Sequence, residues 1–365
     1  MFLNLKAVHN ICIEKVKASY KTKLLLFFSL FIHLLHAEEC EYVYPIATIG
    51  NEKIIYIHQT NLRSIQLLAF NSSDDTIDTI LWSLYTPTQI KILPNNEGFS
   101  FLDNGRLRIQ LFDKRSPRAI DFDKPIYNLF IENWIDEHRT YCSAQYNNHS
   151  ALFELNDDGT VHLLCMHSHK DYLYPQKIDD CLFFIERCMD DAIADYRIVQ
   201  ANYSALLLNQ DATLFECIAD FADKPIIFLT MISKKEGFVI EHQKTVESND
   251  PQAMFWCYYF FNNKNKWVIS RAFSFAVPTK LFFPDSKDRL FESIIPLMPK
   301  FIDNKIYFAD ASGNENNFLE PYWYDIKNKE IRKNIGLNND QHYFVPMLFN
   351  NQLWYGGNGS QLFVF

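Results

Sequence analysis

Short apolar strands alternate with Asp- and Asn-containing turns along most of this chain. Three stretches share one layout: Pro, a short strand, an Asp/Asn pair, and a second strand with adjacent aromatic residues. They are Pro175–Phe184, Pro299–Phe308 and Pro346–Tyr355. Because Asp and Asn tolerate the positive φ of a two-residue hairpin turn, each stretch predicts a β-hairpin. A recurring hairpin predicts a repeat architecture.

Looser copies extend the repeat along the chain. Copies begin near positions 46, 92, 134, 175, 218, 299 and 346, and most neighbours are roughly 40 to 47 residues apart. A second hairpin type lies between these starts. It is predicted at Leu152–Leu164, Tyr259–Val268 and Tyr322–Ile331, the last two with Lys-Asn-Lys at the turn. The repeating unit is therefore two hairpins, or four strands.

Four short antiparallel strands per repeat of this length are typical of a β-propeller blade, and residues 42–365 resemble the β-propeller repeat superfamily. The chain lacks a Trp-Asp dipeptide at blade ends, and Ile306–Asp310 is only faintly similar to Tyr-Trp-Thr-Asp repeats, so no specific family is indicated. The resemblance implies an all-β fold of four-stranded antiparallel blades. Seven blades are favoured, with six or eight as alternatives.

The predicted domain spans residues 38–365, and its segment 232–298 is either an insertion or a degenerate repeat. Six full repeats and a C-terminal fragment lead to the count of seven. The last blade would then have three C-terminal strands, with Glu38–Glu41 as a candidate partner at its edge. If 232–298 hides a further repeat, the count becomes eight.

The first 37 residues have the layout of a targeting segment. Lysines precede an apolar run from Leu24 to Leu35, and Ala37 is a candidate cleavage position. Residues 1–37 are therefore expected to be a signal peptide or an N-terminal anchor. The chain is expected to be exported, to a periplasm or to the outside, or to be membrane-anchored through residues 24–37.

Composition supports a folded β protein that does not bind nucleic acid. Hydrophobic residues make up 48% of the chain and aromatic residues 16%, which favours pleated, packed structure. Removing residues 1–37 leaves 30 basic and 43 acidic side chains, a net charge of −13. Such a surface repels phosphates, so neither nucleic acid nor an anionic membrane is an expected partner.

Seven cysteines remain after residue 37. Cys142 with Cys165, and Cys181 with Cys188, are close enough in sequence to pair within one sheet if the chain is exported. Buried free thiols acting as small hydrophobic residues are the alternative.

One short segment gathers potential metal ligands. His162, Cys165, His167 and His169 lie within eight residues, and an extended strand would place the last three on one face. Imidazole and thiolate suit zinc or copper. Successive ligands on a straight strand are about 6.5–7 Å apart, too far to hold one ion. A solvated loop is the alternative, and whether these residues bind a metal is left open.

Two acidic segments are weaker candidates. Glu186, Asp190, Asp191 and Asp195 surround Cys188, and facing carboxylates can serve glycoside hydrolysis, although a solvated loop is the commoner outcome. Asn156–Thr160 is partly similar to the Asp-box of sialidase propellers but is interpreted as a turn. We assign no catalytic, cofactor-binding or metal-ligating residue and expect no cofactor.

The leading functional hypothesis is an exported, monomeric propeller that binds another protein and is not an enzyme. The alternative is a carbohydrate-binding or hydrolytic propeller that uses its central channel. A binding module should present an exposed patch on one rim, whereas an enzyme should bring carboxylates or His together at the channel mouth. The innermost strands are expected near Pro45, Pro175, Pro299 and Pro346.

Overall fold

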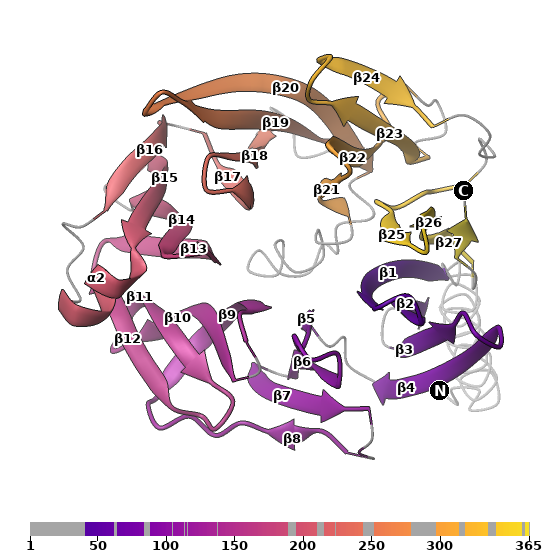
Figure 1. Ribbon diagram of the computed structural model, residues 1–365, viewed down its shortest axis with the longest axis horizontal. Helices are drawn as coiled ribbons and strands as arrows, with labels where there is room; N and C mark the ends of the chain where they lie inside the picture. The colour runs from indigo at the N-terminus through magenta and orange to yellow at the C-terminus, as the bar shows by residue number, and fades with distance from the viewer. Residues whose placement is uncertain are drawn as a thin grey trace, which may run out of the picture. The chain divides into compact units, whose positions relative to one another are not determined.

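Seven antiparallel sheets follow one another around a ring formed by residues 42–365 in the computed structural model (Figure 1). The fold is therefore the predicted all-β propeller, and the favoured count of seven blades is confirmed. The described residues are 41–61, 64–83, 88–103, 105–112, 114, 116–136, 138–188, 195–209, 215–222, 224–243, 252–278, 297–313, 318–334, 341–359 and 362–364. The predicted signal peptide or anchor, residues 1–37, lies outside them.

The first four blades each take four consecutive strands. Blade one contains β1 (Tyr42–Ile49), β2 (Lys53–Asn61), β3 (Ser64–Asn71) and β4 (Thr76–Ser83). Blade two contains β5 (Thr88–Ile92), β6 (Gly98–Asp103), β7 (Arg106–Leu111) and β8 (Arg118–Ala119). Blade three contains β9 (Ile126–Trp134), β10 (Arg139–Tyr146), β11 (His149–Asn156) and β12 (Val161–His167). Blade four contains β13 (Lys170–Ile178), β14 (Cys181–Cys188), β15 (Asp195–Asn202) and β16 (Glu216–Phe221), with α2 (Tyr203–Asn209) before its last strand.

The remaining blades differ more in strand length. Blade five contains β17 (Ile226–Ser233), β18 (Glu236–Gln243), β19 (Gln252–Asn263) and β20 (Lys266–Pro278). Blade six contains β21 (Lys300–Ile302), β22 (Lys305–Asp310), β23 (Glu320–Asp325) and β24 (Glu330–Lys333). Blade seven contains β25 (Met347–Phe349), β26 (Gln352–Tyr355) and β28 (Phe363–Val364). The strands described within 232–298 thus belong to blade five and not to an eighth blade.

The predicted hairpins form because their turn residues adopt positive φ. At the three close copies, positive φ occurs at Asp179, at Asp303 and Asn304, and at Asn350 and Asn351. Asp and Asn accept this conformation at low cost, and it matches the twist of the flanking strands. The two Lys-Asn-Lys stretches differ, however. The turn of β19–β20 has two residues, whereas that of β23–β24 has four.

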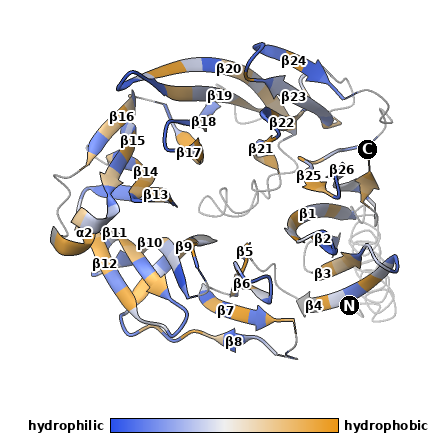
Figure 2. Cartoon of the chain, viewed as in Figure 1, coloured by the Kyte–Doolittle hydropathy of each residue, from blue (hydrophilic) through white to orange (hydrophobic). Residues whose placement is uncertain are grey.

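Alternating side chains pack each blade against both of its neighbours. Figure 2 shows hydrophobic and hydrophilic residues interspersed along the strands of several blades. In blade four, Phe183 and Phe184 are both fully buried, but they belong to hydrophobic clusters on opposite faces of the sheet. Adjacent strand residues point to opposite faces, so aromatic pairs fill the gaps between blades, as the sequence predicts.

The innermost strands are irregular in a recurring way. Register shifts interrupt the pairing of β1, β5, β9, β13 and β17 with their neighbours. Pro45 and Pro175 lie at two of these shifts, where a missing N–H does not break the ladder. Pro299 and Pro346 instead directly precede β21 and β25. All four prolines thus mark innermost strands, and all four are buried.

The ring closes where the two ends of the described chain meet. The short strand β27 (Gly357–Asn358) pairs with β1, with Val43 opposite Gly357. A Cβ atom on Gly356 would lie 2.1 Å from the carbonyl oxygen of Val43, so only glycine permits this approach. The predicted closing segment Glu38–Glu41 lies, apart from Glu41, outside the described residues.

Candidate functional surface

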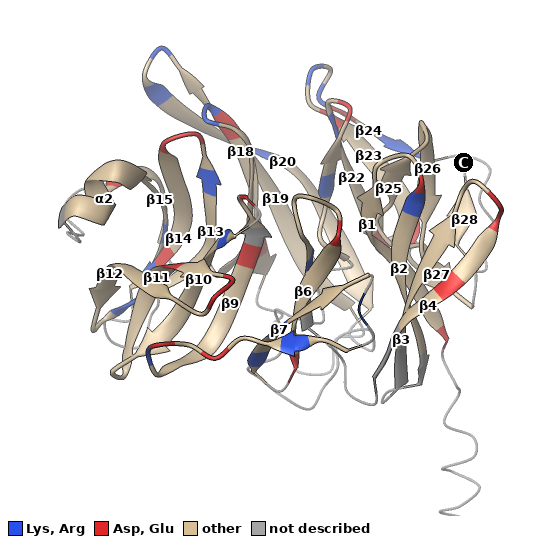
Figure 3. Ribbon diagram, turned by 60° about the horizontal axis from the view of Figure 1, so that its bottom comes forward, with Lys and Arg blue, Asp and Glu red and all other residues tan. Residues whose placement is uncertain are grey.

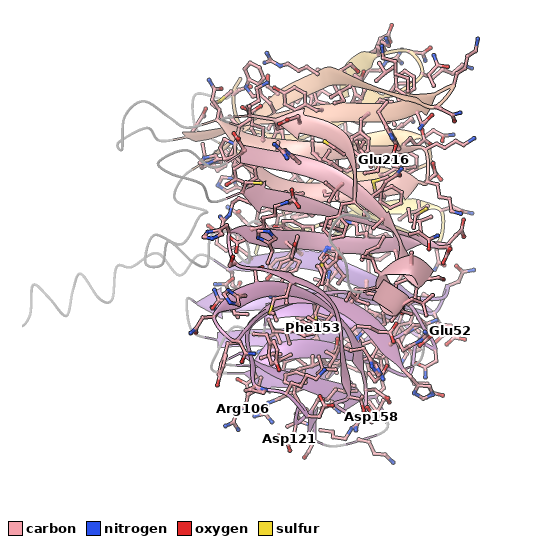
Figure 4. All side chains as sticks on the ribbon, turned by 90° about the vertical axis from the view of Figure 1, so that its left-hand side faces the viewer. Glu52, Arg106, Asp121, Phe153, Asp158 and Glu216 are labelled. Carbon is pink, nitrogen blue, oxygen red and sulfur yellow. The ribbon has the colours of Figure 1, made fainter. Side chains whose placement is uncertain are left out.

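One face of the ring carries, for each blade, the connection between its first two strands and the connection between its last two. In a four-stranded antiparallel blade, the turn between the first two strands and the turn between the last two lie at the same end. Glu52, in the first turn of blade one, and Asp158, in the second turn of blade three, accordingly lie on the same side of the ring in an edge-on view (Figure 4). Arg106, next to a turn of the other kind, lies on the opposite side. We call the first side the turn face.

The turn face is acidic over blades one to four. Among the described residues, its turns there contribute nine carboxylates and one lysine, Lys114. Most of these carboxylates are exposed. They are Glu52, Asp74, Asp75, Glu97, Asp136, Asp157, Asp158, Asp179 and Asp180. We call this part of the turn face the acidic sector.

The turn face is basic over blades five and six. Its turns there contribute five exposed lysines and one described carboxylate, Asp303. The lysines are Lys234, Lys235, Lys264, Lys327 and Lys329. Figure 3 shows blue tips on the projecting hairpins near β20 and β23, and red turns over other blades. We call this part the basic sector.

A pocket of about 670 Å³ opens in the acidic sector between blades two and three. The turn after β5 forms one wall, and the turns of blade three form the rest. Its lining residues are Pro94, Asn95, Asp136, His138, Arg139, Asn156, Asp157 and Asp158. Asn156–Thr160, which the sequence predicts as a turn, does form the turn between β11 and β12 and contributes three of these residues.

The carboxylates of this pocket already have partners within the chain. Partial burial alone would raise the pKa of Asp136, but hydrogen bonds from Arg139 and from the His138 backbone outweigh it and lower the pKa. Arg139 Nη2 lies 2.6 Å from Asp136 Oδ2, and His138 Nδ1 lies 3.3 Å from Asp157 Oδ2. The pocket is therefore a polar depression whose carboxylates Asp136 and Asp157 already contact cationic or imidazole side chains of the same blade.

A long hairpin, β19–β20, carries part of the basic sector. Its strands have 12 and 13 residues. Near the tip, Val268, Ile269, Ser270 and Arg271 are exposed in succession. Because successive strand residues point to opposite faces, this half of β20 is uncovered on both faces.

The potential metal ligands between His162 and His169 do not gather around one point. Cys165 is 1% exposed and packs in the core between blades three and four. His162 and His169 are exposed, and the His167 and His169 rings are 6.3 Å apart. The register shift in β12 falls at Leu164, before Cys165, so Cys165 and His167 do lie on one face of the strand, but only Cys165 is fully buried. Within the described chain, no three His, Cys, Asp or Glu residues are grouped as metal ligands.

The acidic residues around Cys188 do not form one group, because Glu186 lies within β14 and Asp195 begins β15. Glu186 is 3% exposed and accepts a hydrogen bond from Lys170 at 3.0 Å. Asp195 lies opposite Cys188 at the start of β15. Asp190 and Asp191 lie outside the described residues. The buried member of the set is thus already neutralised by a lysine.

None of the six described cysteines forms a disulfide. Cys142 and Cys165 are on strands separated by β11 and belong to cores on opposite faces of the sheet. Cys181 and Cys188 begin and end one strand, roughly 23 Å apart at 3.3 Å per residue. A disulfide needs Cα atoms within about 7 Å, so both candidate pairings are wrong.

The innermost strands carry few titratable groups around the ring centre. Glu132 on β9 lies 4.0 Å from Lys91 on β5. On β21, burial lowers the pKa of Lys300 to about 8. Aromatic rings are more prominent, because Phe130, Tyr174 and Phe228 contact in succession across blades three to five, with ring centroids 4.8 and 5.5 Å apart.

Sequence reasoning missed the segregation of charge on the turn face. In the sequence these residues stand out as turn formers, although their charges also follow the repeat order. Once the hairpins are aligned, the change from Asp/Glu turns to Lys turns after Asp180 is visible in the sequence itself. What the sequence could not supply is that all these turns share one face.

These observations define the class: the chain is a seven-bladed β-propeller whose turn face carries charges of opposite sign in two sectors. No model of a protein family and no curated protein sequence matches it. An oligogalacturonate lyase in complex with manganese is 9% identical, with a TM-score of 0.55 over 88% of this chain and 89% of the lyase. A putative TolB from Agrobacterium tumefaciens is 10% identical, with a TM-score of 0.46 over 82% of this chain and 99% of that protein. At 9% identity, the similarity to the lyase supports the fold alone.

No helix in the described part of the chain is both long and apolar enough to cross a bilayer. The candidate anchor, residues 24–37, lies outside that part.

Proposed function

We propose that this propeller is an exported protein-interaction module that binds its partner with the turn face. The observation that carries the proposal is the segregation of charge into an acidic and a basic sector. Two sectors of opposite sign give a partner one preferred orientation, because the reversed orientation places like charges together. Long-range attraction between complementary patches also accelerates encounter.

The arrangement of the innermost strands agrees with binding rather than with channel chemistry. Catalysis in a channel needs several acid–base groups from different blades around one point. Among the described innermost residues, Glu132 is paired with Lys91, and aromatic rings line the neighbouring blades. Rigid blades then serve to hold the charged turns in fixed relative positions.

The alternative, a carbohydrate-binding or hydrolytic propeller, is favoured by one feature, the polar pocket beside Asp136 and Asp157. Its carboxylates are engaged by Arg139 and His138. Asp157→Asn leaves most of the acidic sector intact. If it abolished binding of a defined oligosaccharide, or its cleavage, the alternative would replace the proposal.

Partner capture with charge-reversed variants tests the proposed function. The full chain carrying Lys235→Glu and Lys327→Glu should lose the protein that the wild type captures from its natural host. Arg106→Glu, on the opposite side of the ring, is the matched control and should retain it (Figure 4). Mass spectrometry after quantitative cross-linking measures both ratios. Equal capture by all three proteins would exclude the turn face as the binding surface.

Export is tested separately, by fractionating host cells that express the full chain. Recovery in the cytosolic fraction alone would contradict the exported location. The partner-capture experiment would still decide whether the turn face binds a partner.

A further inference from the structure

The outer strand of blade five is an unusually long sheet edge. β20 has 13 residues and ends its sheet, whereas the outer strands of blades one to four have between two and eight. An edge strand presents unpaired backbone N–H and C=O groups, and proteins commonly shorten or cover such edges.

The turn of the hairpin determines which backbone groups are unpaired. Lys264 and Asn265 have φ of 51° and 64°, the conformation of a two-residue type I′ turn. The flanking pair, Asn263 with Lys266, is then a hydrogen-bonded pair, and bonded and non-bonded pairs alternate from there. The N–H and C=O of Trp267 and Ile269 therefore point away from β19.

The side chains around these free groups are apolar and accessible. Val268 is 36% exposed and Ile269 is 37% exposed, on opposite faces of the strand. Trp267 is half-buried, with its ring 5.8 Å from that of Phe260. An added strand would thus gain hydrogen bonds and could cover apolar surface on both faces at once.

The charges at the two ends of this segment disfavour a second copy of the chain as the occupant. Segment 264–271 contains three cations, Lys264, Lys266 and Arg271, and no carboxylate. Two copies paired antiparallel through this edge would therefore bring six like charges onto adjacent strands, which is unfavourable. The same three cations attract a strand that carries carboxylates.

We propose that β20, from Lys266 to Arg271, accepts an extended acidic segment of a partner protein as an additional antiparallel strand. Apolar residues of the segment lie opposite Val268 and Ile269, and carboxylates lie opposite Lys266 and Arg271. Main-chain hydrogen bonds supply affinity, and the alternating side chains supply selectivity. The inference rests on the proposed function and assigns part of the partner's chemistry.

A synthetic peptide tests the inference with the full chain. Its sequence is acetyl-Thr-Glu-Thr-Val-Val-Thr-Glu-Thr-amide, which places each Glu opposite a cation of β20. We expect saturable binding by calorimetry. Replacing both Glu by Lys should weaken binding about tenfold or more, and Lys266→Glu with Arg271→Glu in the protein should reverse that preference. A Lys peptide that binds the wild type equally well would overturn the proposal.

Two N-methylated isomers of the peptide provide the matched control for strand addition. Only alternate amides of an added strand face the edge. Methylation of one alternate set should abolish binding, whereas methylation of the other set should change it less than about twofold. Equal behaviour of both isomers would show that no strand is added.

Ile269→Pro removes an outward N–H without touching the β19 ladder, so it should block the peptide without lowering the thermal midpoint. Concentration-dependent dimers that Ile269→Pro disperses would instead identify a second copy as the occupant and overturn the proposal. If partner capture is lost with Lys235→Glu and Lys327→Glu but persists with Ile269→Pro, the proposed function stands and this inference fails.

Discussion

The two sides of blade two are built differently. Towards blade three, the Gln89 side chain bridges two innermost strands, since its Nε2 donates to the Leu129 carbonyl at 3.1 Å and its Oε1 accepts from the Ile131 N–H at 2.5 Å. Trp134 of blade three also donates to Ser100 at 2.7 Å. Towards blade one, a groove of about 480 Å³ remains open between Ala69 and Phe112.

The difference shows that blade joints depend on particular side chains and not on the fold alone. Gln176 repeats the bridge between blades four and five, where it donates to Leu229 at 2.6 Å and accepts from Met231 at 2.9 Å. At the joint of blades one and two, many core neighbours are only partly buried. A tight joint therefore combines a filled core with a polar bridge that satisfies buried backbone groups.

The largest expected effect is the loss of a core aromatic residue on the tight side. Phe153 is fully buried between blades two and three. Phe153→Ala should lower the free energy of unfolding by about 3–5 kcal/mol, because a large cavity remains. Phe112→Ala, beside the groove, should cost about 1–2 kcal/mol because that ring is only partly buried. Equal losses in guanidinium titrations would contradict the distinction between the two joints.

Removing the polar bridge should be the next most damaging change. Gln89→Leu leaves the Leu129 carbonyl and the Ile131 N–H buried without this partner, at a cost of roughly 2–4 kcal/mol. Gln110, on the groove side, donates to the carbonyls of Leu111 and Lys114, both at 2.7 Å. Water in the groove can replace that donor, so Gln110→Leu should cost about 1 kcal/mol or less. The same titrations measure both variants.

Enlarging an alanine should have effects of opposite sign on the two sides. Ala151 is fully buried at the tight joint, and Ala151→Ile should destabilise by about 1–3 kcal/mol through overpacking. Ala69 lines the groove, and Ala69→Ile should be neutral or stabilise by up to about 1 kcal/mol. Thermal midpoints distinguish the outcomes, and destabilisation by both would mean that the groove does not accept added volume.

The smallest expected effect is a change in how often the tight joint opens, which labelling of a buried thiol can report. Burial raises the pKa of the Cys142 thiol, so at pH 8 it stays protonated and reacts with a thiol reagent only after the joint opens. Cys217, an exposed thiol, is the internal control. Gln89→Leu should accelerate labelling of Cys142 about tenfold or more, while Ala69→Ile should leave it unchanged. Mass spectrometry of labelled peptides measures the rates.

The blades were predictable because each repeats a local pattern. Asp and Asn at positions needing positive φ, and aromatic pairs in the second strand, were sufficient to locate β13–β14, β21–β22 and β25–β26. The extent of blade five was not predictable, because its last two strands run to 12 and 13 residues. In the sequence, the distance between successive repeat starts doubles at blade five. The described residues there nevertheless contain only one set of four strands.

The charged surface was less accessible to sequence reasoning. A local cluster such as His162 to His169 is visible in the sequence, whereas the acidic and basic sectors join single turns that are tens of residues apart. Bridges such as Gln89 also escape detection, since one Gln in a strand gives no indication of which neighbouring backbone it reaches. Alternation decides which face a residue occupies, but a single register shift, as at Leu164 and Cys165, reverses the expectation.

The pairing of β27 with β1 makes ring closure a late event. While a ribosome still holds the last residues, blade one lacks β27 beside Val43, and Phe344, whose ring lies 6.2 Å from that of Tyr44, is only then emerging. Until then, the first blades form an open arc in which the side of blade one that later contacts β27 and Phe344 is exposed. In an exported chain this side would be completed after translocation, which makes early folding in the cytosol unproductive and a holding chaperone useful.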